Sequence, residues 1–400
     1  MKLLHTADWH LCDMLHKLDR TPHLRQRVER IAVLCEEHAV DVLVIAGDLF
    51  SDHSAVTVEK MTAELEHMHR TFSAFFARGG TILAITGNHD KDTRIELIRT
   101  SMKLAAVSTG TDLTPGRMYL QNRPALVHLH GVQFALVPYP TQARYANPDD
   151  DFKSAEEVNR AVQGRVAEWV QELPQRPDYD KTQPGVLVAH LHVQGAEAHA
   201  LYKISEQDDV CFASGFIPTE WAYVALGHIH KPQMMNNVEH IRYPGPLDRM
   251  SFSEVTDDRG VVLVEMGPHG RVGVPLWLPL EPTPMYDIEV KDTAAVEANL
   301  DRYPQRETAM VRLTVHEAGG MSRAELHKWA LKHFPYVLHI DWKRPPGETG
   351  SGESQDTKAD YRETVREYLA KKLIDDKDAA AVIALAETFL TENVLMEVAS

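Results

Sequence analysis

The chain of 400 residues contains few cysteines: Cys12, Cys35 and Cys211, of which no two have the C-x-x-C spacing. This small, odd number argues against a disulfide framework or a structural zinc ribbon and is typical of a protein from a reducing cytosol. Long apolar runs are missing too, since no stretch approaches the roughly 20 residues that a membrane span needs. The segment MKLLHTADWH has no signal-peptide core, because His5 and Asp8 interrupt it. We therefore expect a soluble, cytoplasmic protein.

Positive charge is also scarce. The sequence has 42 Lys and Arg against 58 Asp and Glu, a net charge of −16. An acidic surface disfavours nucleic acid as a partner of the whole molecule. A divalent-metal centre can nevertheless hold a phosphodiester locally. The charge balance therefore leaves DNA open only if the chain carries a metal site.

The first 270 residues alternate β-rich runs with helical patterns, which predicts an α/β layered fold. The β-rich runs are KLLHTA (2–7), DVLVIA (41–46), TILAIT (81–86), GVLVAH (185–190) and AYVALG (222–227). Thr21-Pro22 predicts a helix start, and Ser54 predicts the start of a second helix that Gly79-Gly80 ends. A hairpin about Gly131 indicates a second sheet. We expect a two-sheet sandwich flanked by helices.

The chain divides into this sandwich and three further parts. We predict a large domain over 1–278, a small α/β capping domain over 281–342 and a flexible Pro/Gly/Ser linker over 343–357. Residues 358–400 predict two short amphipathic helices with too little core to stand alone. We expect these helices to dock on this chain or on another protein.

Polar residues follow the ends of the five β-rich runs. They are Asp8 and His10; Asp48; Asn88, His89 and Asp90; His190; and His228 and His230. Open α/β sheets assemble ligand sites at the carboxyl ends of their strands. An H-x-H triplet alone is weak support in a chain with 22 histidines, and we interpret His67/His69 and His128/His130 as surface and structural pairs. The five segments together indicate a metal centre.

A two-metal hydrolase explains this set of residue types. Such enzymes hold two ions about 3.5–4 Å apart, so that both contact the reacting phosphoryl group. A carboxylate can bridge that gap, and Asp48 is the candidate bridge. If Asp8 and Asp48 are the only anionic ligands, two divalent ions leave the cluster at about +2, which attracts a phosphodiester. Mixed oxygen and nitrogen ligands favour Mn²⁺ or Fe²⁺ over structural zinc.

The segments LLHTADWHL, GDLF, GNHD, LGHIHKPQ and RYPGPLDRMSFSE (242–254) resemble the calcineurin-like metallophosphoesterase superfamily. Within it they are similar to the SbcD family, the nuclease subunits of SbcCD complexes in DNA double-strand-break repair. The resemblance covers about residues 1–260. It implies an Mn²⁺-dependent 3′→5′ exonuclease on duplex ends and an endonuclease on single strands and hairpins. It also implies a homodimer whose C-terminal helices bind the coiled coil of an SbcC-type ATPase.

The resemblance also implies roles for single residues. One ion would be held by Asp8, His10, Asp48 and His230, and the other by Asp48, Asn88, His190 and His228. His89 matches the catalytic histidine, and we expect Asp90 to orient its other ring nitrogen. Candidate DNA contacts are His53, Lys91, Arg94 and Arg249. An ordinary surface residue is an equally good interpretation of His53, and an ordinary surface charge is the favoured interpretation of each of the other three. Cys12 departs from the glycine usual in the family, and Ser51 stands where some relatives have a substrate-positioning histidine.

Two other functions are open at this point. The first is another metallophosphoesterase, either a phosphatase or a cyclic-nucleotide phosphodiesterase. Against it, Leu49-Phe50-Ser51 stands where phosphatases have an arginine after Gly-Asp. The second is a catalytically silent scaffold. Silent relatives tend to lose ligands, whereas all seven predicted ligands and His89 are in place here.

Overall fold

The computed structural model describes residues 1–53, 56–104, 111–145, 147, 150–199, 210–217, 220–316 and 321–343. Met1–Trp342 form one compact unit. Ser54, nearly all of the predicted linker and the predicted C-terminal helices lie outside the described residues. Because Met1–Trp342 form a single unit, the predicted domain boundary near residue 280 stays a prediction. Among the helices of the described part, none is both long enough and apolar enough to cross a bilayer.

Two six-stranded sheets form the centre of the fold. The first contains, in spatial order, β16 (Gly270–Leu280), β15 (Arg259–Gly267), β1 (Lys2–Thr6), β4 (Val42–Ala46), β5 (Thr81–Ile85) and β6 (Met118–Gln121). The second contains β13 (Gln233–Met234), β14 (Ile241–Tyr243), β12 (Tyr223–Gly227), β9 (Gly185–His190), β8 (Val132–Val137) and β7 (Ala125–Leu129). Strands β1, β4 and β5 run parallel in the first sheet, as β8, β9 and β12 do in the second.

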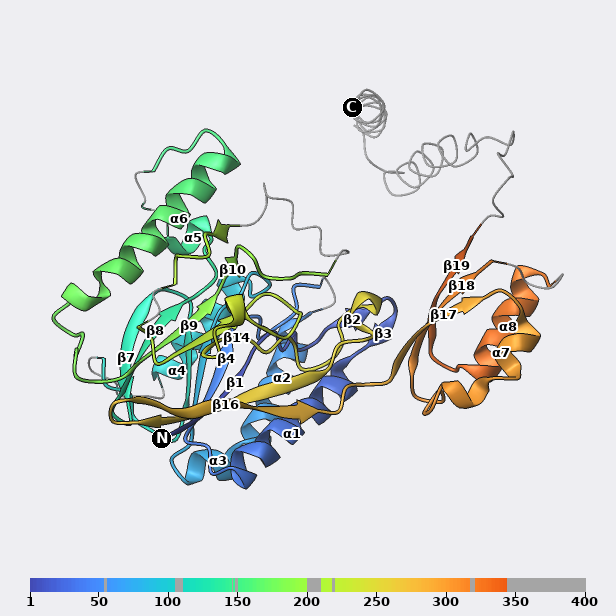
Figure 1. Ribbon diagram of the computed structural model, residues 1–400, viewed down its shortest axis with the longest axis horizontal. Helices are drawn as coiled ribbons and strands as arrows, with labels where there is room; N and C mark the ends of the chain where they lie inside the picture. Colours follow the sequence, from blue (N-terminus) through green and yellow to red (C-terminus); the bar gives the residue numbers. More distant parts are fainter. Residues whose placement is uncertain are drawn as a thin grey trace, which may run out of the picture. The chain divides into compact units, whose positions relative to one another are not determined.

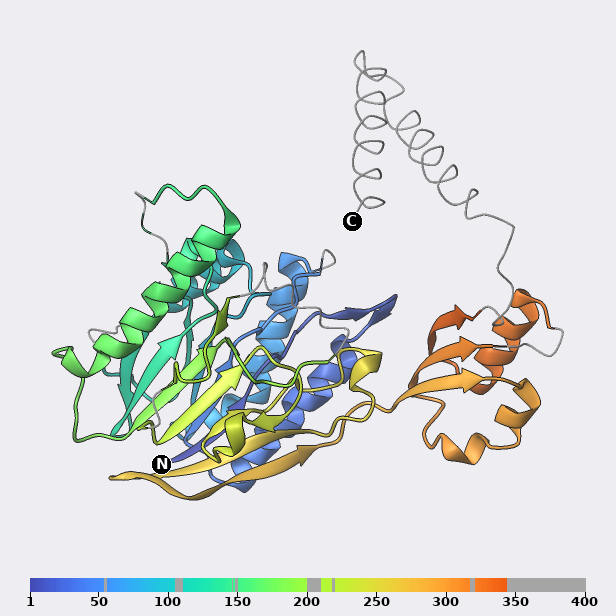
Figure 2. The ribbon, with the colours of Figure 1, turned by 45° about the horizontal axis from the view of Figure 1, so that its top comes forward.

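The two sheets pack face to face and are covered by helices on their outer faces. Strand β4 shows why, because all its residues are buried: Leu43 and Ile45 face one core, and Val42, Val44 and Ala46 face the core shared with the second sheet. A strand buried on both faces has no polar alternation. Helices α1 (Thr21–Glu37) and α6 (Ala155–Glu172) lie on opposite sides of the sheets (Figures 1 and 2). The predicted two-sheet sandwich is confirmed.

The second predicted helix differs in detail from the sequence pattern. It is divided into α2 (Val58–Thr71) and α3 (Ser73–Ala77), and Thr57 caps α2 by accepting a hydrogen bond from the Lys60 backbone N–H at 3.3 Å. Phe72, between the two helices, is fully buried and stacks on Trp9 with ring centroids 6.4 Å apart. Two further α-helices of the described part of the sandwich are α4 (Asp92–Leu104) and α5 (Gln142–Tyr145). A two-stranded ribbon of β2 (Met14–Leu15) and β3 (Leu18–Asp19) follows the end of β1.

A third sheet is built from the last described residues. Its parallel strands are β17 (Met285–Val290), β18 (Met310–Val315) and β19 (Val337–Trp342). Helices α7 (Thr293–Glu297) and α8 (Arg323–His333) cover one face of this sheet (Figure 1). A capping box between Ser322 and Glu325 begins α8. Val290, Leu313 and Phe334 belong to a separate hydrophobic core.

Candidate metal centre

The residues after the five strand ends converge at the edge where the carboxyl ends of the parallel strands meet. Seven of them are at most 7% exposed: Asp8, His10, Asp48, Asp90, His190, His228 and His230. Asn88 is exposed and His89 is partly exposed. Buried polar side chains need partners. The arrangement therefore requires either mutual hydrogen bonds or a cation among these residues.

The turns that carry these side chains have unusual backbone conformations. Asp8, His10, Asp48 and His228 have φ values of +53°, +45°, +51° and +99°, in or near the left-handed region that non-glycine residues rarely adopt. Such conformations collect at functional sites. The close approach of two turns also requires glycine, because a Cβ on Gly87 would lie 2.0 Å from Asp48 Oδ1. The motif glycines therefore allow the strand ends to approach one another.

Asp8, His10 and His230 form the first group of candidate ligands. His10 Nε2 lies 3.3 Å from His230 Nε2, and one ligand atom of each of the three residues lies within 4.8 Å of the others. Asp8 Oδ2 is buried and accepts no hydrogen bond from the part of the chain that the structure describes. Two nitrogens that share an ion lie roughly 3–3.5 Å apart, since each is about 2.1 Å from the metal. These three residues fit one divalent ion.

His190, His228 and Asn88 form the second group. Asn88 Oδ1 lies 3.0 Å from both His190 Nε2 and His228 Nδ1. His190 Nδ1 donates a hydrogen bond to the Ala46 carbonyl oxygen at 2.7 Å. In a neutral ring Nε2 then carries no proton and presents a lone pair. That lone pair would face the oxygens of Asn88 and Asp48. Only a cation, either a proton or a metal ion, makes this arrangement favourable.

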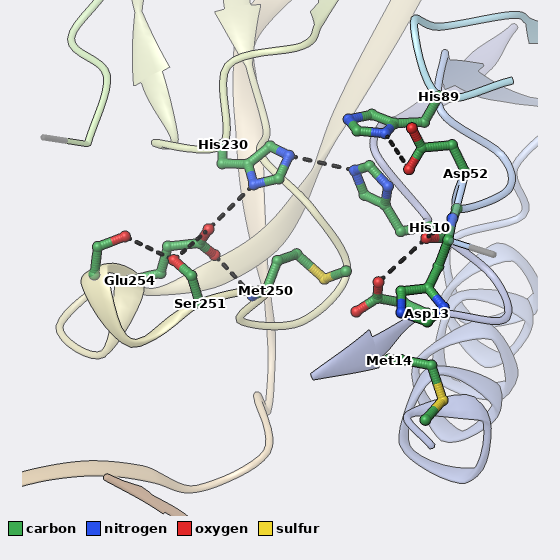
Figure 3. A pocket seen from close by; sticks show the side chains of 12 residues that line it. His10, Asp13, Met14, Asp52, His89, His230, Met250, Ser251 and Glu254 are labelled. Carbon is green, nitrogen blue, oxygen red and sulfur yellow. Dashed lines mark hydrogen bonds and ion pairs between the residues drawn. The ribbon is translucent and has the colours of Figure 1, made fainter. Parts of the chain in front are cut away.

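Asp48 lies between the two groups. Its Oδ2 is 3.3 Å from His190 Nε2 and 3.7 Å from His10 Nε2, while Oδ1 accepts the His89 backbone N–H at 2.8 Å. Figure 3 shows His10 beside His230 and His89. One carboxylate oxygen thus faces nitrogens of both groups. This is the position that a bridging ligand between two ions would occupy.

The electrostatics of the centre show the same coupling. Burial would raise the pKa of Asp48, but His190, followed by His10 and His89, holds that pKa well below its usual range. Burial would lower the pKa of His190, yet Asp48 and Asp8 raise it to about 9. Without a metal, the His190 ring therefore carries a proton on both nitrogens at neutral pH and is positively charged. Metal binding must release that proton, since a ligating imidazole is neutral.

Glu254 is a buried partner of His230 that the sequence reasoning did not identify. His230 Nδ1 donates to Glu254 Oε1 at 3.1 Å. The fully buried Arg259 donates to Glu254 Oε2 at 2.5 Å and to the His230 carbonyl at 2.9 Å. Burial would raise the pKa of Glu254, but His230 and Arg259 lower it to about 2. The carboxylate fixes the proton of His230 on Nδ1, so that the lone pair on Nε2 can bind an ion.

Replacing Glu254 with glutamine is expected to weaken the binding of one metal ion by about 10- to 100-fold, because a neutral amide holds the His230 ring less well. Isothermal titration of the metal-free protein with Mn²⁺ measures this. Glu265→Gln, on an exposed position of β15, is the matched control. Equal affinities for both ions in the Glu254 variant and the control would contradict the role of Glu254.

The partner of the His89 ring differs from the expectation. His89 Nδ1 lies 3.0 Å from Asp52 Oδ1. The Asp90 carboxylate instead accepts the backbone N–H groups of Leu49, Phe50 and Gly87 at 3.1, 3.0 and 2.9 Å. Asp90 therefore does not orient the His89 ring but joins the turn after β4 to the turn after β5. Asp52, which the sequence reasoning missed, lies in the GDLFSD segment only four residues after Asp48.

The four predicted DNA contacts lie in different places. His53 lines a cavity together with His10, His89 and His230. Lys91 precedes α4 and Arg94 lies in its first turn. Arg249 Nη2 donates to the Asp257 carbonyl at 3.1 Å. Of the four, only His53 adjoins the metal centre through this cavity.

The chain is similar to several known proteins. The family model for calcineurin-like phosphoesterases matches residues 1–232. The SbcD protein of the SbcCD nuclease from Bacillus subtilis is 24% identical over 85% of each chain. The SbcD protein from Rhodobacter capsulatus is 27% identical over 76% of each chain. A dimetal phosphatase structure from Danio rerio has a TM-score of 0.40 and 10% identity, and covers 70% of this chain and 99% of its own.

Proposed function

The chain belongs to the calcineurin-like phosphoesterase family, and on that premise we propose that it is a two-metal-dependent DNA nuclease. The observation that carries this proposal is the position of Asp48, whose carboxylate faces histidines of both ligand groups. The similarity to SbcD proteins of SbcCD nucleases supports DNA as the substrate. We further propose Mn²⁺ as the metal, 3′→5′ cleavage at duplex ends and endonuclease cleavage of single strands and hairpins.

In this proposal Asp8, His10 and His230 hold one ion, Asn88, His190 and His228 hold the other, and Asp48 contacts both. Two bound ions would supply polarisation of the phosphodiester and activation of the attacking water. His89 extends from the turn after β5 into the cavity beside His10, with ring centroids 4.9 Å apart. Asp52 Oδ1 lies 3.0 Å from Nδ1, so a proton on Nδ1 points to this carboxylate and Nε2 is the ring nitrogen that can meet the substrate. His89 is therefore positioned to stabilise the transition state or to protonate the leaving 3′-oxygen.

The assembly of the protein is a second part of the proposal. We propose that residues 358–400 bind the coiled coil of an SbcC-type ATPase, and that the nuclease chain is a homodimer in the complex. The similarity to SbcD proteins, which are named as parts of SbcCD nucleases, supports this partnership. Co-elution of the full-length chain with such an ATPase in size-exclusion chromatography tests it, and separate elution under all nucleotide conditions would contradict it.

The nuclease proposal predicts cleavage of hairpin and blunt-ended duplex DNA by the purified full-length chain in Mn²⁺. EDTA should stop the reaction, and added Mn²⁺ should restore it, because the ligands of both groups are in place. Denaturing gel electrophoresis of end-labelled DNA measures the products. Hydrolysis of phosphopeptides or cyclic nucleotides, without cleavage of any DNA, would contradict the proposal in favour of another phosphoesterase activity.

A further inference from the structure

A cavity of 270 Å³ opens beside the metal centre (Figure 3). One wall comes from the N-terminal half of the chain and the other from the segment after β12. The lining residues are His10, Asp13, Met14, Ser51, Asp52, His53 and His89 on the first wall, and His230, Met250, Ser251, Ser253 and Glu254 on the second. Since two candidate metal ligands line it, an occupant would adjoin a phosphate bound at the metal centre.

The charge of the lining argues against a second phosphate as the occupant. Asp13 and Asp52 contribute carboxylates, Glu254 is already paired with Arg259 and His230, and the twelve lining residues include no lysine or arginine. Phosphate groups are held by cationic side chains, metal ions or helix N-termini. The part of the cavity away from the metal ligands therefore suits a neutral group that donates hydrogen bonds.

The apolar part of the lining suits a flat ring. Met14, in β2, lies on the first wall, and Met250 lies on the second (Figure 3). Thioether groups make favourable contacts with aromatic rings and adapt to different shapes. Beside Met250, the hydroxyl oxygens of Ser251 and Ser253 lie 2.6 Å apart. Two polarisable side chains combined with hydroxyl and carboxylate acceptors match a nucleobase with exocyclic amino groups.

The volume limits the size of the occupant. A cavity of 270 Å³ is slightly smaller than the roughly 300–1,000 Å³ of pockets that enclose drug-sized ligands. It accommodates about one nucleoside rather than a segment of duplex. A base can enter such a cavity only after it has left its stack and its pair, which is easiest in a single strand, a hairpin loop or a frayed end.

We propose that this cavity binds one nucleobase adjoining the scissile phosphate and so makes cleavage depend on an unstacked base. This inference rests on the proposed nuclease function and adds a base-binding subsite to it. The phosphate is held by the metal ions, and the base is held between Met14 and Met250. Preference for single-stranded and terminal DNA then follows from the subsite as well as from the metal centre.

The test uses the full-length protein and single-stranded oligonucleotides that contain one abasic tetrahydrofuran residue at a defined position. Cleavage of one phosphodiester next to the abasic residue is expected to fall by about tenfold or more relative to the unmodified strand, because the contacts to the base are lost. Cleavage at distant bonds of the same strand should be unchanged. Equal cleavage next to abasic and normal residues would overturn the subsite.

Two variants make the test specific to the cavity. Met14→Ala and Met250→Ala are expected to lower kcat/KM on the unmodified strand and to reduce the ratio between unmodified and abasic strands toward one. Met234→Ala, on an exposed position of β13, is the matched control and should keep the wild-type ratio. An unchanged ratio in both cavity variants, with metal content and melting temperature as in the wild type, would overturn the role of the two methionines.

The same assays separate this inference from the proposed function. Failure of the wild-type protein to cleave any of the strands in Mn²⁺ would contradict the nuclease function itself. Cleavage of all strands without regard to missing bases would leave the nuclease function intact and would overturn only the base-binding subsite.

Discussion

Replacing Asp48 with alanine is expected to eliminate hydrolysis and to reduce the metal content of the protein from two ions to one or none. The carboxylate lies 3.3 Å from His190 Nε2 and 3.7 Å from His10 Nε2, so its loss would remove a ligand from both proposed ions. Metal ions supply several kcal/mol of transition-state stabilisation. Each step of about 1.4 kcal/mol corresponds to a tenfold change in rate, so we expect kcat to fall by about 10³-fold or more.

Elemental analysis after equilibrium dialysis against Mn²⁺, together with gel-based cleavage rates, measures both effects. Asp151→Ala changes an exposed aspartate distant in sequence from the motifs and serves as the control. Asp48→Asn adds a finer test, because the amide can still accept the His89 backbone N–H but cannot supply the negative charge. Two tightly bound ions in the alanine variant would contradict a bridging position for Asp48.

Replacing His89 with glutamine is expected to lower kcat by about 10²- to 10³-fold while both metal ions stay bound. The reason is that His89 lines the cavity and lies beside Asp52. The proposed ligands of each ion do not include His89. Retained metal with lost turnover would identify His89 as a group that acts on the substrate. Steady-state rates and elemental analysis on the same preparation provide the two readouts.

The control for this variant is His69→Gln, which alters an exposed histidine on α2. The metal measurement matters because ligand atoms of His10, Asp48 and His89 also lie within 4.8 Å of one another. Loss of one ion in the His89 variant would show that His89 is a ligand rather than a proton donor. Turnover equal to that of the wild type would contradict both roles.

The strands that build the metal centre could be predicted from sequence because their signals are local. Each is a short apolar run that ends at glycine or at a polar motif, and a parallel sheet places such ends on one edge. The predicted run 185–190 coincides with β9, and 41–46 contains β4. The grouping of side chains at this edge followed from residue types and from resemblance to a known family.

The partners of these side chains could not be predicted in the same way. Asp90 follows His89 directly, which suggested contact, but its side chain turns inward to three backbone N–H groups. Asp52 reaches His89 from a different turn. Glu254 is 24 residues from His230, and no spacing rule connects them. Side-chain direction after a turn depends on backbone angles and packing that the sequence pattern does not reveal.

The origin of the ligands in two different sheets has a consequence for how the protein is assembled. Asp8, His10, Asp48 and Asn88 follow strands of the first sheet, whereas His190 ends a strand of the second sheet and His228 and His230 follow another. Each proposed ion therefore takes ligands from both sheets, and neither sheet alone offers a complete set. In the proposed centre, metal loading would be completed only after the sheets have packed together. Bound ions would then act as cross-links between the two halves of the sandwich, and part of their binding free energy would become folding stability.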